Sequence, residues 1–112
     1  MVERMENLVK RDGRWFKKFT EIPFTGQIIE HHDNGQLKEK GNYRNGEKEG
    51  AWSFHHDNGQ LRKKGKWKTR KEEGKWVGYN EDGTVNESMT GTFIYGKNIS
   101  NFWNHFKGNF LK

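Results

Sequence analysis

The sequence predicts an all-β protein, an elongated single-layer antiparallel sheet of stacked β-hairpin repeats. Two observations lead to this prediction. The string HHDNGQL occurs at residues 31–37 and again at 55–61, an offset of 24 residues, and repeats with periods of this kind form stacked supersecondary units. Each copy also contains Asn-Gly, which between alternating apolar and polar residues is the strongest short signal for a hairpin turn.

The composition supports an open sheet rather than a thick core. The chain has 112 residues, so one domain is expected, and only 29% of them are apolar. Aromatic residues nevertheless make up 14%, with five Trp and eight Phe, whereas disordered chains are poor in them. Burial is therefore expected to depend on a few large rings spread along the sheet.

Recurring glycines divide the chain into three segments. A lead-in with a partial hairpin occupies residues 1–23, three hairpin units of about 24 residues fill 24–100, and an aromatic segment follows at 101–112. The third unit slips by two residues before GTFIYGKN. The glycines that mark the period are Gly26, Gly50 and Gly74, and then Gly35, Gly59 and Gly83.

The Asn-Gly turns predict a register for each hairpin. A two-residue type I′ turn requires φ > 0 at both central residues, and we expect this turn at 34–35, 58–59 and 82–83. In the second unit it pairs Asp57 with Gln60, His56 with Leu61, Phe54 with Lys63 and Trp52 with Gly65.

Strand alternation collects the large rings on one face of the sheet. In a one-layer sheet this face must be covered by the termini or by a partner, and large exposed apolar patches mark interaction sites. The predicted partner-binding residues are Trp52, Phe54, Trp67, Trp76 and Phe93. The same face should carry His56, Leu61 and Gly65 in the second unit, Ile28, Leu37, Gly41 and Tyr43 in the first, and Val85 in the third.

A basic patch accounts for the net charge of +6. Residues 62–75 contain eight basic and two acidic residues, and the rest of the chain is balanced. A solvated outer face, an acidic protein partner, nucleic acid and an anionic membrane are all compatible with this pattern. The patch is formed by Arg62, Lys64, Lys66, Lys68 and Arg70, of which the three lysines share one strand face opposite Trp67.

The histidine pairs 31–32 and 55–56 do not predict a metal site. Adjacent strand residues point to opposite faces, and His32 and His56 are about two strand spacings, roughly 10 Å, apart. Asp33 and Asp57 are typical turn residues. The chain has no Cys and no catalytic motif, so we expect no catalytic residues, no metal, no cofactor and no enzyme activity.

The C-terminal segment has helical rather than strand spacing. Phe102, Phe106 and Phe110 recur every four residues, which favours a short amphipathic helix with Ser100 or Asn101 as its N-cap. We expect this segment to cap the open end of the sheet. No apolar run reaches the roughly 18 residues of a membrane span. The compartment stays open: cytoplasmic for the sequence as it stands, or envelope or secreted if a signal segment precedes it.

The units resemble the bacterial variant of the MORN repeat. The shared pattern is G-x-W-x-x-[YH]-x-x-[DN]-G-x-[LV]-x-x-x-G-x-[YW] followed by N-G-x-x-x-G, and it covers about residues 24–100. The lead-in LVKRDGRWFKKFTEIPFTG is also similar to proteins labelled antitoxin components of toxin–antitoxin systems. Ile28 departs from the pattern at its Trp position, and Thr69-Arg70 departs at its Asn-Gly position.

The resemblance implies a non-enzymatic repeat scaffold that binds a protein partner such as a toxin and that can also form oligomers. The alternative hypothesis is a basic surface module for nucleic acid or anionic phospholipid headgroups. Salt dependence separates the two, because neutralising phosphates makes binding fall steeply with salt.

Overall fold

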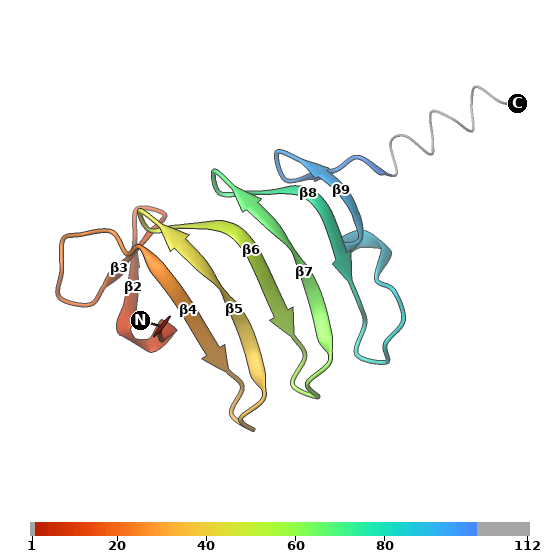
Figure 1. Ribbon diagram of the computed structural model, residues 1–112, viewed down its shortest axis with the longest axis horizontal. Helices are drawn as coiled ribbons and strands as arrows, with labels where there is room; N and C mark the ends of the chain where they lie inside the picture. Colours follow the sequence, from red (N-terminus) through yellow and green to blue (C-terminus); the bar gives the residue numbers. More distant parts are fainter. Residues whose placement is uncertain (1, 101–112) are drawn as a thin grey trace, which may run out of the picture.

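The computed structural model describes residues 2–100 and confirms the predicted sheet of hairpins (Figure 1). Eight strands form one sheet in the order β1-β4-β5-β6-β7-β8-β9-β10, and β2 pairs with β3 in a separate two-stranded sheet. Two 3₁₀ helices, Met5–Asn7 (η1) and Glu87–Met89 (η2), interrupt the strands. The strands are Val2–Glu3 (β1), Leu8–Arg11 (β2), Arg14–Lys17 (β3), Gly26–His31 (β4), Leu37–Arg44 (β5), Glu47–His55 (β6), Leu61–Lys68 (β7), Lys71–Gly78 (β8), Gly91–Ile94 (β9) and Lys97–Asn98 (β10).

The main sheet is antiparallel from β4 to β10 and differs from the prediction at its N-terminal end. There β1 joins β4 in parallel, so the sheet is mixed. The lead-in contains a complete rather than a partial hairpin, with β2 and β3 joined at Asp12-Gly13. The predicted C-terminal helix falls on residues outside those that the structure describes.

The register of the second hairpin is confirmed away from its turn. Trp52 pairs with Gly65 and Phe54 pairs with Lys63. Near the turn the prediction is wrong, because His55 rather than His56 pairs with Leu61. A three-residue loop causes the difference: the His56 N–H donates to the Gln60 carbonyl at 2.9 Å, and a bulge restores the register beyond.

The predicted type I′ turns at the HHDNGQL motifs are also wrong. Only the glycines Gly35, Gly59 and Gly83 have positive φ there, as in three-residue loops that end in a left-handed residue. Two-residue turns with positive φ at both positions lie at the other ends of the hairpins, away from the HHDNGQL loops (Figure 1). They are Asp12-Gly13, Asn45-Gly46, Thr69-Arg70 and Tyr95-Gly96.

Each HHDNGQL loop binds the loop of the next hairpin through two side chains, and we call this pair of bonds the turn latch. His32 Nε2 lies 2.8 Å from the His55 carbonyl oxygen, and Asn34 Nδ2 donates to the Asp57 carbonyl at 2.6 Å. The second loop repeats the arrangement: His56 Nε2 is 2.8 Å from the Tyr79 carbonyl oxygen, and Asn58 Nδ2 donates to the Glu81 carbonyl at 3.1 Å.

The third loop contains no such latch. Asn80 and Asp82 occupy the positions of His56 and Asn58, and both bind Thr84 within their own loop. The motif therefore connects hairpins in the first two units, while the third loop closes upon itself.

Tryptophan rings lie over bare glycine backbone, and each of these contacts joins one hairpin to the preceding one. The Trp52 ring lies over Gly41 of the preceding hairpin, and the Trp76 ring lies over Gly65, so that a Cβ at either glycine would overlap the indole. Each indole also donates to the preceding hairpin, Trp52 Nε1 to Asn42 O at 3.0 Å and Trp76 Nε1 to Lys66 O at 3.1 Å. One residue type thus supplies both the apolar and the polar contact between hairpins.

The core is a single row of side chains on the face predicted for the rings. The predicted members His56 and Val85 do not belong to it, because His56 lies in the latch loop and Val85 is 52% exposed. The β2–β3 sheet packs over the N-terminal end through Trp15, whose ring lies 6.3 Å from that of Tyr43. The buried residues of the core are Leu8, Ile28, Tyr43, Trp52, Phe54, Trp76 and Phe93.

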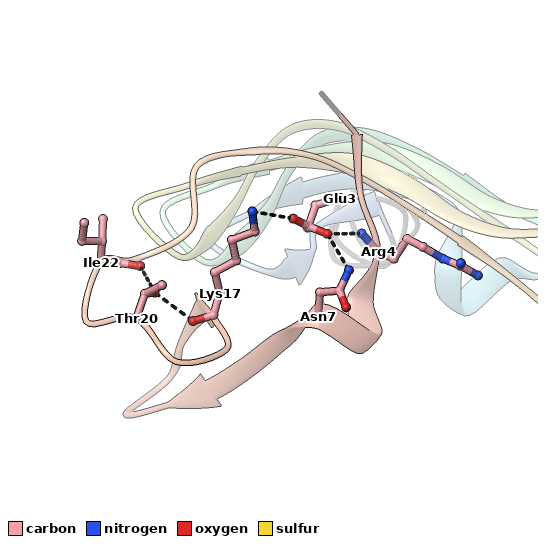
Figure 2. Close-up of polar contacts among 6 residues, drawn as sticks. All are labelled: Glu3, Arg4, Asn7, Lys17, Thr20 and Ile22. Atoms are coloured by element: carbon pink, nitrogen blue, oxygen red, sulfur yellow. Dashed lines mark hydrogen bonds and ion pairs between the residues drawn. The ribbon is translucent and has the colours of Figure 1, made fainter.

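Polar contacts of Glu3 hold the N-terminal segment in place (Figure 2). Its carboxylate accepts hydrogen bonds from Arg4 N at 3.1 Å and Asn7 Nδ2 at 2.8 Å, and it lies 3.2 Å from Lys17 Nζ on β3. These bonds lower the pKa of Glu3, with the Asn7 amide as the largest cause. Glu3 therefore connects β1, η1 and the two-stranded sheet.

Candidate partner-binding surfaces

The five predicted partner-binding rings form much of the core. Trp52, Phe54, Trp76 and Phe93 are between 2% and 9% exposed, and Trp67 is half-buried. Edge-to-face contacts link the rings, with centroids 5.8 Å apart for Trp67 and Trp76. Their role in partner binding stays a prediction, and so little exposed area means that they offer few direct contacts.

Two lysines outside the predicted site, Lys48 and Lys63, lie over these rings. Lys48 Nζ is 5.2, 5.4 and 5.1 Å from the ring centroids of Trp52, Phe54 and Trp67. Lys63 Nζ is 5.1 Å from Phe54 and 5.6 Å from Trp76. Ammonium groups are attracted to ring faces, and their methylene stems cover apolar surface. The predicted pairing of Lys63 with Phe54 was the signal in the sequence for this cover.

Burial lowers the pKa of both lysines. For Lys48 desolvation is the largest cause, the Glu39 carboxylate opposes it, and Lys63 and Lys10 add to it. For Lys63 desolvation again leads, followed by the charge of Arg62. The open side of the core is thus covered by partly desolvated cations.

The predicted basic patch divides into two parts. Arg62, Lys64, Lys66 and Lys68 are exposed on the other face of the sheet. Arg70 lies in the Thr69-Arg70 turn, where its Nε donates to Glu47 Oε1 at 2.9 Å. Four of the five residues therefore share one face of the sheet, and the fifth, Arg70, lies at the end of the β7–β8 strand pair.

A groove of about 970 Å³ runs along this second face, which we call the groove face. Ala51 and Ser53, which pair with Lys66 and Lys64, have small side chains on this face, and Gly41 and Gly65 line it with backbone alone. The groove extends from Gln27 on β4 to Thr92 on β9. Its charged lining residues are Lys40, Lys64, Lys66, Lys75 and Glu73.

The charges of the groove lysines are not paired within the residues that the structure describes. Lys40, Lys64, Lys66 and Lys75 are exposed, and none forms an ion pair with another residue of the described range 2–100. Lys40 and Lys64 are equivalent positions of successive units, 24 residues apart. Ser53 lies between them, paired to both. The groove thus presents four lysines against one carboxylate, that of Glu73.

Other site types find little support in the described part of the chain. Residues 2–100 contain no group of three or more His, Asp or Glu placed to hold a metal ion. Over the same residues, no helix is long and apolar enough to traverse a bilayer. His32 and His56 each bind a backbone carbonyl, those of His55 and Tyr79.

A row of hairpins joined side by side, with one face forming the core and the other a groove, defines a β-hairpin repeat protein. Residues 24–45 and 48–69 match the family model of the MORN repeat variant. These segments correspond to the β4–β5 and β6–β7 hairpins. No curated protein and no solved structure matches the chain.

The third hairpin lies outside the matched segments but repeats their design. Trp76 pairs with Gly91 as Trp52 pairs with Gly65. The glycine follows two residues later than the repeat period requires, and η2 occupies the longer connection. MORN repeats are non-catalytic repeat modules that generally serve as scaffolds for binding.

Proposed function

We propose that this protein is a non-enzymatic repeat scaffold that binds an acidic protein partner through the groove face. The observation that carries the proposal is the groove of about 970 Å³ with four lysines that lack ion-pair partners within residues 2–100. Unpaired charges of one sign attract a partner of opposite charge and orient it during encounter. The burial of the rings favours the groove face over the ring face for direct contact.

Lysine spacing suggests the shape of the bound element. Lys40 and Lys64 lie on strands two apart, about 10 Å by the usual strand spacing. Residues seven apart on an α-helix are separated by about 10.5 Å along its axis. An acidic helix of the partner with carboxylates at i and i+7 would therefore match the two lysines.

Charge reversal tests this proposal. The probe is a synthetic helical peptide with Glu at i and i+7, labelled for fluorescence anisotropy. The variant Lys40→Glu/Lys64→Glu/Lys66→Glu should weaken binding at least tenfold. Lys18→Glu/Lys38→Glu/Lys97→Glu changes the net charge equally at exposed sites outside the groove and should retain most of the affinity. Equal losses in both variants would reject the groove as the docking surface.

By its resemblance to antitoxin components, we further propose that the partner is a toxin. Co-expression with the neighbouring open reading frame tests this idea through host growth. The wild-type chain should restore growth that the neighbour inhibits, and the triple groove variant should not. A harmless neighbour, or rescue by both forms, would contradict the antitoxin role.

A second candidate function is binding of nucleic acid or anionic phospholipid headgroups, which the same four lysines favour. Stacking on single-stranded bases requires aromatic side chains at the surface, whereas Trp52 and Trp76, the aromatic residues in the groove lining, are only 2% and 4% exposed. If this alternative holds, an oligonucleotide or phosphatidylserine vesicles will bind more tightly than the acidic peptide. Their affinity will also fall steeply between low and physiological salt.

A further inference from the structure

A second cavity, which we call the edge cavity, lies at the ends of the strands where the two-residue turns of three hairpins meet. Its volume is about 350 Å³, and residues of the turns Asp12-Gly13, Asn45-Gly46 and Thr69-Arg70 contribute to its wall. This size is at the lower end of pockets that hold small organic ligands. The cavity is separate from the groove, with which it shares no lining residue.

Three cations from different elements line this edge cavity: Lys10 on β2, Lys48 on β6 and Arg70 in the turn after β7. The one carboxylate in the lining, Glu47, already pairs with two arginines through one of its oxygens. Its Oε1 lies 3.4 Å from Arg14 Nε and accepts from Arg70 Nε at 2.9 Å. The cations therefore exceed the negative charge that the lining residues supply.

Glu47 binds only one of the three guanidinium nitrogens of Arg70. Only its Nε donates to Glu47, while both terminal nitrogens lie near Gly13, 3.6 and 3.9 Å from the position of a Cβ built there. A planar guanidinium presents paired donors that match the two oxygens of a carboxylate or phosphate. The bare Gly13 leaves space for this group above the Asp12-Gly13 turn.

The backbone that presents Arg70 is strained. Thr69 and Arg70 have φ of 48° and 72°, in the left-handed region that disfavours β-branched residues in particular. The equivalent turn of the preceding hairpin uses Asn45-Gly46 for the same conformation. Backbone strain of this kind clusters at ligand sites, and here it places a guanidinium where the repeat pattern has a glycine.

The wall of the cavity is partly aromatic. Trp15 and Trp67 both line it. Trp67 Nε1 is buried and has no hydrogen-bond partner among the described residues, 2–100. The other two indoles of the ring row, Trp52 and Trp76, donate to backbone carbonyls.

From these observations we propose that the edge cavity binds the oxyanion of a small organic molecule. The carboxylate or phosphate group lies between Lys10, Lys48 and Arg70, and a flat apolar portion packs against Trp15 and Trp67. The site is independent of the groove and of the partner proposed for it.

The test uses benzoate and phenyl phosphate as probes, with benzamide as the neutral control of the same shape, at constant ionic strength. Five tryptophans give five indole N–H signals in a ¹H–¹⁵N spectrum, and Trp67→Phe assigns the signal of interest. Benzoate or phenyl phosphate should shift the Trp67 and Trp15 signals saturably, whereas benzamide should not. The preferred anion then identifies the ligand group as carboxylate or phosphate. Equal shifts with benzamide, or none with either anion, would overturn the proposal.

Two variants locate the site. Arg70→Gly removes the guanidinium and introduces the residue that its φ favours, so the chain should fold and bind the anion at least tenfold more weakly. Lys48→Met, which keeps the apolar stem, should also weaken binding. Lys64→Met in the groove is the matched control and should leave affinity unchanged. Retained affinity in Arg70→Gly and Lys48→Met, or an equal loss in Lys64→Met, would show that the anion does not bind in this cavity.

Discussion

Residues 69 and 70 show what a local sequence signal can miss. The chain forms a two-residue turn there with Thr and Arg, although neither favours positive φ. The neighbouring strands impose the turn: Lys68 pairs with Lys71 and Trp67 with Glu72. The ion pair between Arg70 and Glu47 also holds the turn against the preceding hairpin.

Thr69→Asn should stabilise the protein, because Asn tolerates the left-handed region better than a β-branched residue does. We expect the free energy of unfolding to rise by about 0.5–1 kcal/mol. The reciprocal change Asn45→Thr, at the equivalent position of the preceding hairpin, should lower it by a similar amount. Urea denaturation measures both, and the turn would not be strained if the two changes had the same sign.

The covering lysines should make stability depend on pH. Burial lowers the folded-state pKa of Lys48 and Lys63 below the ordinary 10.5, so near neutral pH folding pays for burying both charges. As pH rises from the lowered values toward 10.5, the unfolded state binds more protons than the folded state, and stability increases. Tyr43 acts oppositely above pH 10, because burial raises its pKa and ionisation then favours unfolding.

Urea denaturation between pH 7.5 and 10 tests this prediction. The free energy of unfolding of the wild-type chain, relative to Lys48→Met/Lys63→Met, should increase with pH over this range. Lys18→Met/Lys97→Met, which removes two exposed charges, should show no such trend. A difference that is flat or falls with pH would mean that the ammonium groups are not desolvated in the folded state.

At the scale of the element, the hairpins were predictable and their loops were not. Alternation and the 24-residue period yield the units and the pairs Trp52–Gly65 and Phe54–Lys63. The loop type depends on contacts outside the hairpin, since His56 and Asn58 bind the following loop. The sequence of one hairpin does not show these contacts with the next loop. The recurrence of His and Asn at equivalent positions of two units is consistent with them.

The turn latch should contribute measurably to stability. His56→Phe keeps a ring of similar size but leaves the Tyr79 carbonyl without its side-chain donor, at a cost of about 1–2 kcal/mol. His55→Phe is the matched control, because His55 takes part in the latch only through its backbone carbonyl. Thermal and urea unfolding of the two variants would show equal stability if the latch made no contribution.

For the whole molecule, alternation predicted which side chains share a face but not what covers that face. We expected the termini or a partner to cover the rings of the predicted site. Lysines of the same sheet and the neighbouring rings cover much of their surface instead. Long side chains that cover apolar surface look identical, in sequence, to solvated ones. The groove was likewise invisible, because it comes from small residues of several strands that the sheet brings together.

Because each hairpin packs chiefly on its neighbours, stability should spread along the array by nearest-neighbour contacts rather than through one central core. Trp76 links the second and third hairpins, since its ring covers Gly65 and its Nε1 donates to Lys66 O. Trp76→Ala should therefore cost about 3–5 kcal/mol, and the loss should be local. Native-state hydrogen exchange should show early loss of protection in β8 and β9, while β4 and β5 stay protected. Trp15→Ala at the other end should give the reverse order, exposing the β2–β3 sheet first. Uniform loss of protection in both variants would instead mean that the hairpins unfold as a single cooperative unit.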